Sequence, residues 1–258
     1  MLKELYTAAL GMVPQQTRLE VLSNNIANAN TVGFKRESAF ERSLISAQSN
    51  LNNTKGDVEQ DDTPTDTFTD YSQGATERTG NQFDFAIDGK KGYFTVEDND
   101  GNQYLTRAGH FTLGSNGKIE TPDGLTLIGE NGPLFVLQQI TGNSIDSSKA
   151  ITIRVQENGD VFSNDQSIGR LQLTDVENPQ TLQRETGSHF STTDDTITTP
   201  IPQAEISIKQ GYVENSNVNI IKEMVEMIEL QRMFEMGQKV IQTNDGTLDR
   251  SIDVGRFG

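Results

Sequence analysis

The sequence predicts an α+β protein in which helices at the two ends of the chain enclose a mainly antiparallel β region. Apolar residues recur every seven positions near both termini, and between them the pattern changes to short β-branched and aromatic segments. Asp-Gly and Asn-Gly steps recur in this middle part, and such steps favour the tight turns of hairpins. We therefore expect one helical part built from both termini and a separate β part.

The N-terminal helix is expected from an apolar line at seven-residue spacing, which lies along one side of a helix. This line consists of Leu5, Met12, Leu19 and Ile26. Pro14 conflicts with it, because a proline inside a helix removes a backbone hydrogen bond and costs about 3 kcal/mol. We expect a kink at Pro14 or a second helix that starts there.

The C-terminal helix is expected from a second line at the same spacing. This line consists of Ile220, Met227, Phe234, Ile241 and Leu248, with Met224 beside it. An isolated helix is marginal in water, so each terminal helix needs a partner, and the simplest partner is the other one. We expect a coiled-coil-like pair with apolar surface left over. Packing on the chain's own β part and assembly with other subunits both remain open as uses of that surface.

An asparagine-rich stretch, "SNNIANANTVGFKR" (23–36), follows the first apolar line. Asparagine favours caps and turns, because its short amide competes for nearby backbone groups. The stretch therefore predicts the end of the helix and a structured loop. Its candidate residues are Asn24, Asn25, Asn28, Asn30, Gly33 and Phe34.

The middle of the chain predicts a compact β domain over residues 82–209. Its expected strands are 83–87, 92–97, 104–107, 118–121, 125–129, 151–155, 168–176 and 205–209, with turns at 100–101, 116–117, 123–124, 131–132 and 158–159. Residues 48–81 hold few large apolar side chains and are expected to form an extended polar connector. The predicted parts are thus 1–47, 48–81, 82–209 and 210–258.

Composition argues against several classes of function. The chain has no cysteine, which excludes disulfides and thiolate chemistry. Its net charge of −16 lies almost wholly in the middle of the chain, and this negative charge argues against nucleic-acid binding. His110 and His189 show no metal-ligand spacing and are expected in loops or at the surface. "EDNDGN" (97–102) lacks the spacing of a calcium loop and predicts a hairpin turn. We expect a non-enzymatic chain without catalytic residues, cofactor or metal.

Membrane insertion and a cleavable signal are also not expected. No stretch approaches the roughly 18 apolar residues of a membrane span, and the start lacks a basic segment followed by an apolar run.

Three blocks of the sequence carry a resemblance to a known family. Residues 9–37, "ALGMVPQQTRLEVLSNNIANANTVGFKRE", resemble the N-terminal signature of the bacterial flagellar rod and hook axial proteins. Residues 210–248, which contain "GYVENSNVNIIKEMVEMIELQRMFEMGQKVI", are similar to their C-terminal signature. Residues 71–96, "YSQGATERTGNQFDFAIDGKKGYFTV", resemble the entry into the β domain of the rod members. Two features depart from the family pattern: Pro14, and an extra residue between the glycines of "DGKKGYF".

The resemblance implies a structural subunit of the flagellar rod, the drive shaft of the basal body. Its terminal helices would assemble helically around the export channel, and the rod would transmit torque across the periplasm. It implies export by the flagellar type III apparatus without a cleaved signal, and partners that are copies of the chain and other rod or hook axial proteins. The two apolar lines and the asparagine-rich stretch would serve assembly, with Phe34, Lys35 and Arg36 anchored against neighbouring subunits.

Several alternatives remain open. Short matches at 129–136, 167–173 and 234–241 are closer to the proximal than to the distal rod protein, so a distal rod or hook-type subunit is the alternative within the family. An alternative of another class is a β domain that binds or hydrolyses cell-wall carbohydrate. A third is a free secreted protein that merely shares the export signal.

Overall fold

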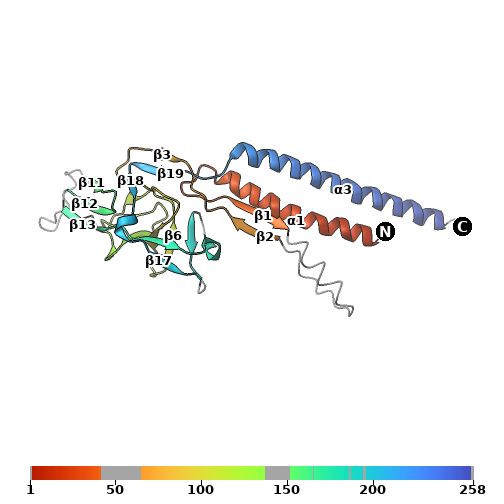
Figure 1. Cartoon of the computed structure of the whole chain (residues 1–258). Helices are drawn as coiled ribbons and strands as arrows, with labels where there is room; N and C mark the ends of the chain where they lie inside the picture. Colours follow the sequence, from red (N-terminus) through yellow and green to blue (C-terminus); the bar gives the residue numbers. More distant parts are fainter. Residues whose placement is uncertain are drawn as a thin grey trace. The chain divides into compact units, whose positions relative to one another are not determined.

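The structure is a computed structural model that describes residues 2–41, 65–136, 152–164, 166–185, 187–193 and 196–256 (Figure 1). The chain forms two compact units. Residues 1–27, 36–70 and 218–258 belong to the first, which we call the helical unit. Residues 28–35 and 71–217 belong to the second, which we call the β unit. Much of the expected connector, residues 48–64, lies outside the described residues.

The helical unit contains two long helices and a two-stranded ribbon. Helix α1 (Leu2–Ala27) and helix α3 (Ile220–Arg256) contact each other and run in opposite directions (Figure 1). Strand β1 (Glu37–Glu41) pairs antiparallel with β2 (Thr65–Thr69), and β1 also contacts α1. Strand β2 falls inside the expected connector, so at least this part of it forms ordered structure.

Pro14 lies inside α1, which continues for more than three turns beyond it. The prediction of a second helix beginning at Pro14 is therefore wrong. Proline removes only one hydrogen bond from the helical ladder, and its fixed φ is itself helical. The bonds on either side, together with the contact to α3, are sufficient to continue the helix.

The β unit is built from short strands, and every pairing between described strands is antiparallel, as the sequence predicts. The largest sheet has the order β15-β16-β6-β5-β9-β8-β7, with β10 on β9, β14 on β5 and β17 on β14. Its strands are β5 (Tyr93–Glu97), β6 (Gln103–Thr106), β7 (Thr112–Leu113), β8 (Ile119–Glu120), β9 (Thr126–Gly129), β10 (Gly132–Pro133), β14 (Leu173–Val176), β15 (Gln183–Arg184), β16 (His189–Ser191) and β17 (Thr198–Pro200).

Smaller sheets and two 3-10 turns complete the β unit. The sheets are β11 (Ile153–Val155) with β12 (Asp160–Ser163) and β13 (Gln166–Arg170), β4 (Phe85–Ile87) with β18 (Ile208–Gln210), and β3 (Thr76–Arg78) with β19 (Tyr212–Glu214). The 3-10 turns cover Pro179–Thr181 and Gln203–Glu205. The last two pairings join residues near 80 to residues near 210, which closes the unit at the points where the chain enters and leaves it.

Phenylalanine rings form the centre of the β unit. Phe85, Phe94 and Phe111 are fully buried, and the ring of Phe111 lies 5.7 Å from that of Phe85 and 5.5 Å from that of Phe94. Ile119 and Leu127 of the neighbouring strands belong to the same cluster. Aromatic pairs at this separation contribute beyond the burial of their area, so these rings add to the stability of the β unit.

The turn predictions are confirmed in the β unit. The glycine of each predicted turn, at 101, 117, 124, 132 and 159, has a positive φ. In the "EDNDGN" hairpin between β5 and β6, the Asp98 carboxylate accepts hydrogen bonds from the Asn102 side chain and from the backbone of Asp100 and Asn102. These bonds, the Asn102 side chain foremost, hold the pKa of Asp98 below its ordinary value.

Two details of the β prediction are wrong. The expected strand 168–176 is divided into β13 and β14, because the chain changes sheets between Arg170 and Leu173. His189, expected in a loop or at the surface, is buried in β16, and its Nε2 lies 3.1 Å from Asp123 Oδ2. This strand could not be predicted, because the residues around His189 are mostly serine and threonine and show no clear alternation of apolar and polar side chains. His110 is about half exposed, as expected, and its Nδ1 lies 2.7 Å from Asp84 Oδ1.

Candidate assembly site

The asparagine-rich stretch ends α1 as predicted, and its second half enters the β unit as a structured loop. Residues 28–30 form a turn in which the Thr31 backbone N–H donates to the Asn28 carbonyl and the Thr31 hydroxyl donates to the Asn28 side chain. Asn30 is exposed. Asn28 therefore shapes the loop through its hydrogen bonds to Thr31, whereas the side chain of Asn30 faces solvent.

Gly33 brings the backbone of this loop close to Ala108 and Glu214 of the β unit. Its φ is +71°, and its N–H donates to the Glu214 carbonyl at 2.7 Å. A Cβ atom at this position would lie 2.2 Å from the backbone nitrogen of Ala108. Only glycine satisfies both the left-handed backbone and the close approach.

Phe34 is 1% exposed, and the guanidinium of Arg184 lies over its ring at 4.4 Å from the centroid. The same guanidinium lies 5.4 Å from the ring centroid of Phe190 and donates to the Lys35 carbonyl. Cation–π contacts are strongest where water is excluded, as it is here. Phe34 is thus part of the interior of its own β unit.

Lys35 forms a buried ionic cluster with Glu214 and Arg107, whose side chains are 1–2% exposed. Lys35 Nζ donates to Glu214 Oε1 at 2.6 Å and to the Ser72 carbonyl at 2.8 Å. Arg107 Nη1 donates to Glu214 Oε2 at 3.3 Å. Gly74 N–H donates to Glu214 Oε1, so each carboxylate oxygen has a donor, as a buried charge requires.

In the helical unit, Asn25 and Glu223 form a second buried polar cluster, which we call the Asn25 clamp. The Asn25 Nδ2 donates to the Glu37 carbonyl at 2.7 Å and to Glu223 Oε2 at 3.1 Å, while its Oδ1 accepts from the Glu37 N–H at 2.9 Å. Arg36 Nε donates to Glu223 Oε1 at 2.6 Å. Asn25 and Glu223 are fully buried, so the clamp fixes α1, α3 and β1 in one register.

Phe34, Lys35 and Arg36 therefore make contacts within their own chain, and their expected role as anchors on neighbouring subunits stays a prediction. The sequence-based argument missed Glu214, Arg107 and Glu223, which supply the partners. Glu223 carries a signal in retrospect: it lies three residues after Ile220 and four before Met227, on the apolar side of α3, where a carboxylate needs a buried cation.

The apolar line predicted on the C-terminal helix is only partly buried. Ile220, Met227, Phe234 and Ile241 are partly buried, and the residues that share their side of α3 are Glu223, Leu230 and Gly237. Leu230 is 3% exposed, although the sequence pattern placed it off the line, and Met224 is 49% exposed. The side chain of Leu248 lies outside the described part of the chain.

The N-terminal line is placed similarly. Leu19 and Ile26 are partly buried, while the neighbouring Val21 and Leu22 are buried. The side chains of Leu5 and Met12 lie outside the described part of the chain. Asn24 is exposed beside the Asn25 clamp. The inward side of α1 therefore includes Val21 and Leu22 beside the expected line.

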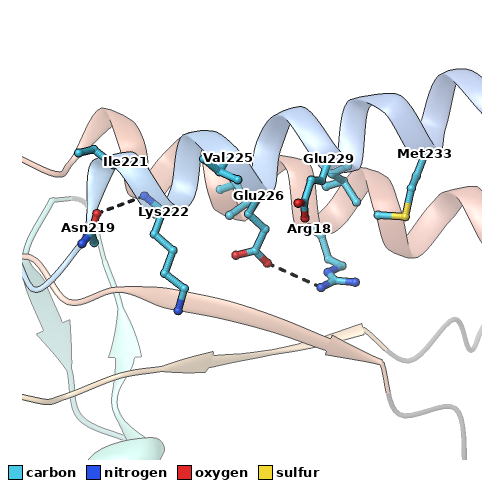
Figure 2. Close-up of a pocket in the computed structure, with 10 residues that line it drawn as sticks. Arg18, Asn219, Ile221, Lys222, Val225, Glu226, Glu229 and Met233 are labelled. Carbon is cyan, nitrogen blue, oxygen red and sulfur yellow. Dashed lines mark hydrogen bonds and ion pairs between the residues drawn. The ribbon is translucent and has the colours of Figure 1, made fainter.

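A groove of about 580 Å³ runs beside the contact between α1 and α3 (Figure 2). Leu22 and Leu230 contribute buried apolar side chains to it, and Val225 and Met233 contribute half-exposed ones. Arg18 Nη2 and Glu226 Oε1 form an ion pair of 3.7 Å across it. The groove is apolar inside and charged at its rim, which is the character of a helix-binding surface.

Among the described residues, no three His, Asp or Glu side chains are grouped so that they could hold a metal ion. No helix in the described part of the chain is both long enough and apolar enough to cross a bilayer.

The fold and these contacts define a class of protein: an α+β chain whose N- and C-terminal helices contact each other in one helical unit and whose buried polar groups fix backbone register. Three family models match it. They are described as "Flagella basal body rod protein" (residues 5–35), "Flagellar hook protein FlgE/F/G D1 domain" (residues 86–163) and "Flagellar basal body rod FlgEFG protein C-terminal" (residues 209–254).

Full-length relatives agree with these models. The chain is 32% identical to the flagellar basal-body rod protein FlgG of Bacillus subtilis, over 99% of this chain and 100% of the relative. It is 34% identical to FlgG of Buchnera aphidicola subsp. Schizaphis graminum, over 97% and 98%. It is 30% identical to the rod protein FlgF of Caulobacter vibrioides, over 98% and 97%. The chain belongs to the flagellar basal-body rod protein family, and is a structural protein of the rod.

Proposed function

We propose that this chain assembles helically through its helical unit, around a central channel, and that the resulting rod transmits torque. In this proposal α1 and α3 form a coiled-coil-like inner layer, and the β unit stands outside it. The partners are copies of the chain and other rod or hook axial proteins. The chain passes through the flagellar type III export apparatus without a cleaved signal and functions in the part of the basal body that spans the periplasm.

One observation carries the assembly proposal: α3 keeps a large apolar surface in water in the isolated chain. Seven large apolar residues between 221 and 240 are 43–76% exposed, namely Ile221, Met224, Val225, Ile228, Met233, Met236 and Val240. A soluble chain rarely leaves such a contiguous apolar surface uncovered unless it binds a partner. The surface lies on the helix that the family model for the C-terminal region matches.

The buried clusters support assembly indirectly. Torque that passes along a rod must be carried by the chain between its helical and β units without local unfolding. The loop 28–36 is tied at Gly33 and Lys35 inside the β unit and at Arg36 inside the helical unit. In the proposal, Gly33 and Phe34 serve assembly by fixing the loop 28–36, through which the chain passes from the helical unit to the β unit. Asn25 serves assembly by fixing the register of α1.

The test is removal of residues 220–248 from the chain in the native bacterium. We expect the shortened chain to be absent from purified basal bodies and motility to be lost. A motile strain with normal rods would contradict the proposal. The predicted proximal position is tested separately by imaging basal bodies of a strain that lacks the gene, because loss of a proximal or of a distal segment stops the rod at different lengths.

The alternative of a cell-wall hydrolase has a simple test as well. We expect no catalysis, so suspensions of purified cell wall incubated with the protein should keep their turbidity. Clearing that disappears when a single Asp or Glu is replaced would instead support an enzyme.

A further inference from the structure

A cavity of about 460 Å³ opens in the β unit, where it is lined by residues of strands β14 and β17 and of the loop that precedes β5. All the described residues that line it belong to this unit. The volume lies within the range of ligand pockets, roughly 300–1,000 Å³. Tyr71, Tyr93 and Val176 contribute apolar surface, while charged and hydroxyl-bearing side chains share the rest of the lining. The cavity therefore combines an aromatic surface with polar groups, as sites for small organic molecules do.

The hydroxyl of Tyr93 points to a ligand in this cavity. Tyr93 is 4% exposed, and its hydroxyl has no hydrogen-bond partner among the described residues. A tyrosine hydroxyl usually finds a partner when the ring is buried. This oxygen is not sealed from solvent, so it reaches the cavity that the side chain lines. Burial raises the pKa of Tyr93, so the hydroxyl keeps its proton and can donate to a bound molecule.

The loop beside Tyr93 carries the extra residue of "DGKKGYF", which places both Lys90 and Lys91 at the cavity. Arg107, which is 3% exposed, holds this loop from the interior. Its Nη1 donates to the Gly89 carbonyl at 3.0 Å and its Nη2 to the Lys90 carbonyl at 2.7 Å. Its guanidinium also lies 5.2 Å from the centroid of the Tyr93 ring. One buried cation thus positions both the loop and the ring, so this side of the cavity is preformed.

The charges at the cavity cancel one another. They come from two lysines, Lys90 and Lys91, and from two carboxylates, Asp175 and Glu177. Lys91 Nζ lies 3.6 Å from Asp175 Oδ2, while Lys90 and Glu177 form no ion pair with any residue in the described part of the chain. A chain of net charge −16 disfavours a strong anion, and a cation would find many other carboxylates on it. Donors and acceptors around an aromatic surface instead suit a neutral molecule whose hydroxyls both donate and accept.

We propose that this cavity binds a short neutral oligosaccharide. The apolar face of a sugar ring would pack against the side chains of Tyr71 and Tyr93. The sugar hydroxyls would accept hydrogen bonds from the Tyr93 hydroxyl and the Lys90 ammonium and donate to the Glu177 carboxylate. The step is binding alone, with no bond made or broken. It goes beyond the assembly proposed for the helical unit, because every residue of this site belongs to the β unit.

Isothermal titration calorimetry of the purified full-length chain tests this proposal with a set of tetrasaccharides. Cellotetraose and the tetramer of N-acetylglucosamine are neutral, tetragalacturonate is anionic, and the glucosamine tetramer is cationic. We expect at least one neutral probe to bind at millimolar concentration or below, and the charged probes to bind more weakly. Because no ligand charge takes part, the affinity for the neutral probe should change little with salt.

The variant Tyr93→Phe removes the hydroxyl and keeps the ring. We expect the Kd of the neutral probe to rise about three- to tenfold, because one hydrogen bond between uncharged groups is lost. Tyr104→Phe is the matched control, since Tyr104 lines a different cavity of the β unit and its change should leave the Kd as it is.

The variant Lys90→Met tests the loop and keeps the length of the side chain. Lys90 is exposed, so this variant retains the test if circular dichroism shows that Tyr93→Phe does not fold. We expect the Kd of the neutral probe to rise by about threefold or more. Lys118→Met is its control, because Lys118 does not line this cavity.

Three results would overturn the proposal. Absence of binding by both neutral tetrasaccharides, up to the limit of their solubility, would show that the cavity is not a saccharide site. Equal affinity of the wild-type chain and both variants would place the binding elsewhere on the molecule. Tighter binding of a charged probe than of either neutral one would show that the cavity selects an ionic ligand.

Discussion

Lys35 Nζ lies 2.6 Å from Glu214 Oε1, and both side chains are 1% exposed in the interior of the β unit. The two residues are far apart in the sequence, at the entry to the β unit and at its exit. Glu214 also accepts a hydrogen bond from the buried Arg107. The pair therefore ties the loop that follows α1 to the strand that precedes α3, which makes it the first target for mutation.

Replacing Lys35 with methionine should strongly destabilise the β unit. Removing one partner of a buried ion pair leaves an uncompensated charge, which costs about 3–5 kcal/mol; the remaining Arg107 places the expected loss near the lower value. Urea denaturation followed by fluorescence or circular dichroism measures the change. Lys209→Met is the matched control, because Lys209 pairs with Asp88 at 2.8 Å while both remain about half exposed. Equal effects of the two variants would contradict the assigned importance of the buried pair.

Replacing Gly33 with alanine should be more costly than the same change at Gly80. Both glycines have a positive φ, +71° and +75°, so both variants lose roughly 1–2 kcal/mol from backbone strain. A Cβ atom at Gly33 meets the backbone of Ala108, whereas one at Gly80 meets nothing within 4 Å. The difference between the two midpoints of thermal unfolding isolates the close approach, and similar midpoints would show that the loop moves away freely.

Replacing Asn25 with alanine should destabilise the helical unit by about 1–3 kcal/mol, because the backbone groups of Glu37 and the Glu223 carboxylate lose buried partners. Hydrogen exchange at the Glu37 amide measures this directly and should become faster. Asn30→Ala, at an exposed position of the same stretch, should leave that exchange unchanged. An unchanged Glu37 amide in the Asn25 variant would show that the clamp does not protect this strand.

Tyr93 should make the β unit sensitive to alkaline pH. Burial raises the pKa of Tyr93 above its ordinary value of about 10, although the nearby charge of Arg107 opposes the shift. The unfolded chain then loses the phenolic proton before the folded chain does, so this contribution to stability is present below about pH 10 and is lost as pH rises further. Denaturation midpoints between pH 8 and 11 should fall less steeply in Tyr93→Phe than in the control Tyr212→Phe; parallel slopes would contradict the prediction.

Local chemistry explains why much of the fold could be predicted. Asp-Gly and Asn-Gly steps specify backbone conformations that few other residues adopt, so the turns at Gly101 and Gly124 follow from the sequence. Two-residue strands such as β7 and β15 were missed, because they are too short to show alternation and exist only through their partners.

The buried clusters could be recognised only in part. The asparagine-rich stretch indicates a structured loop, and its glycine and lysine stand out within it. However, no local pattern joins Lys35 to Glu214 or Asn25 to Glu223, since each pair is separated by most of the chain. Their importance depends on burial, which is a property of the folded units.

The sequence by itself determined the two terminal helices, the antiparallel β region and the family, because periodicity, turn residues and signature blocks are local properties. Only the tertiary structure decided which side of each helix turns inward. An apolar line at Ile220, Met227 and Phe234 can be completed by positions three or four residues away, and both choices keep the same period. The contact with α1 selects Glu223 and Leu230 and leaves Met224 in water, since the partner helix determines which side chains lose solvent.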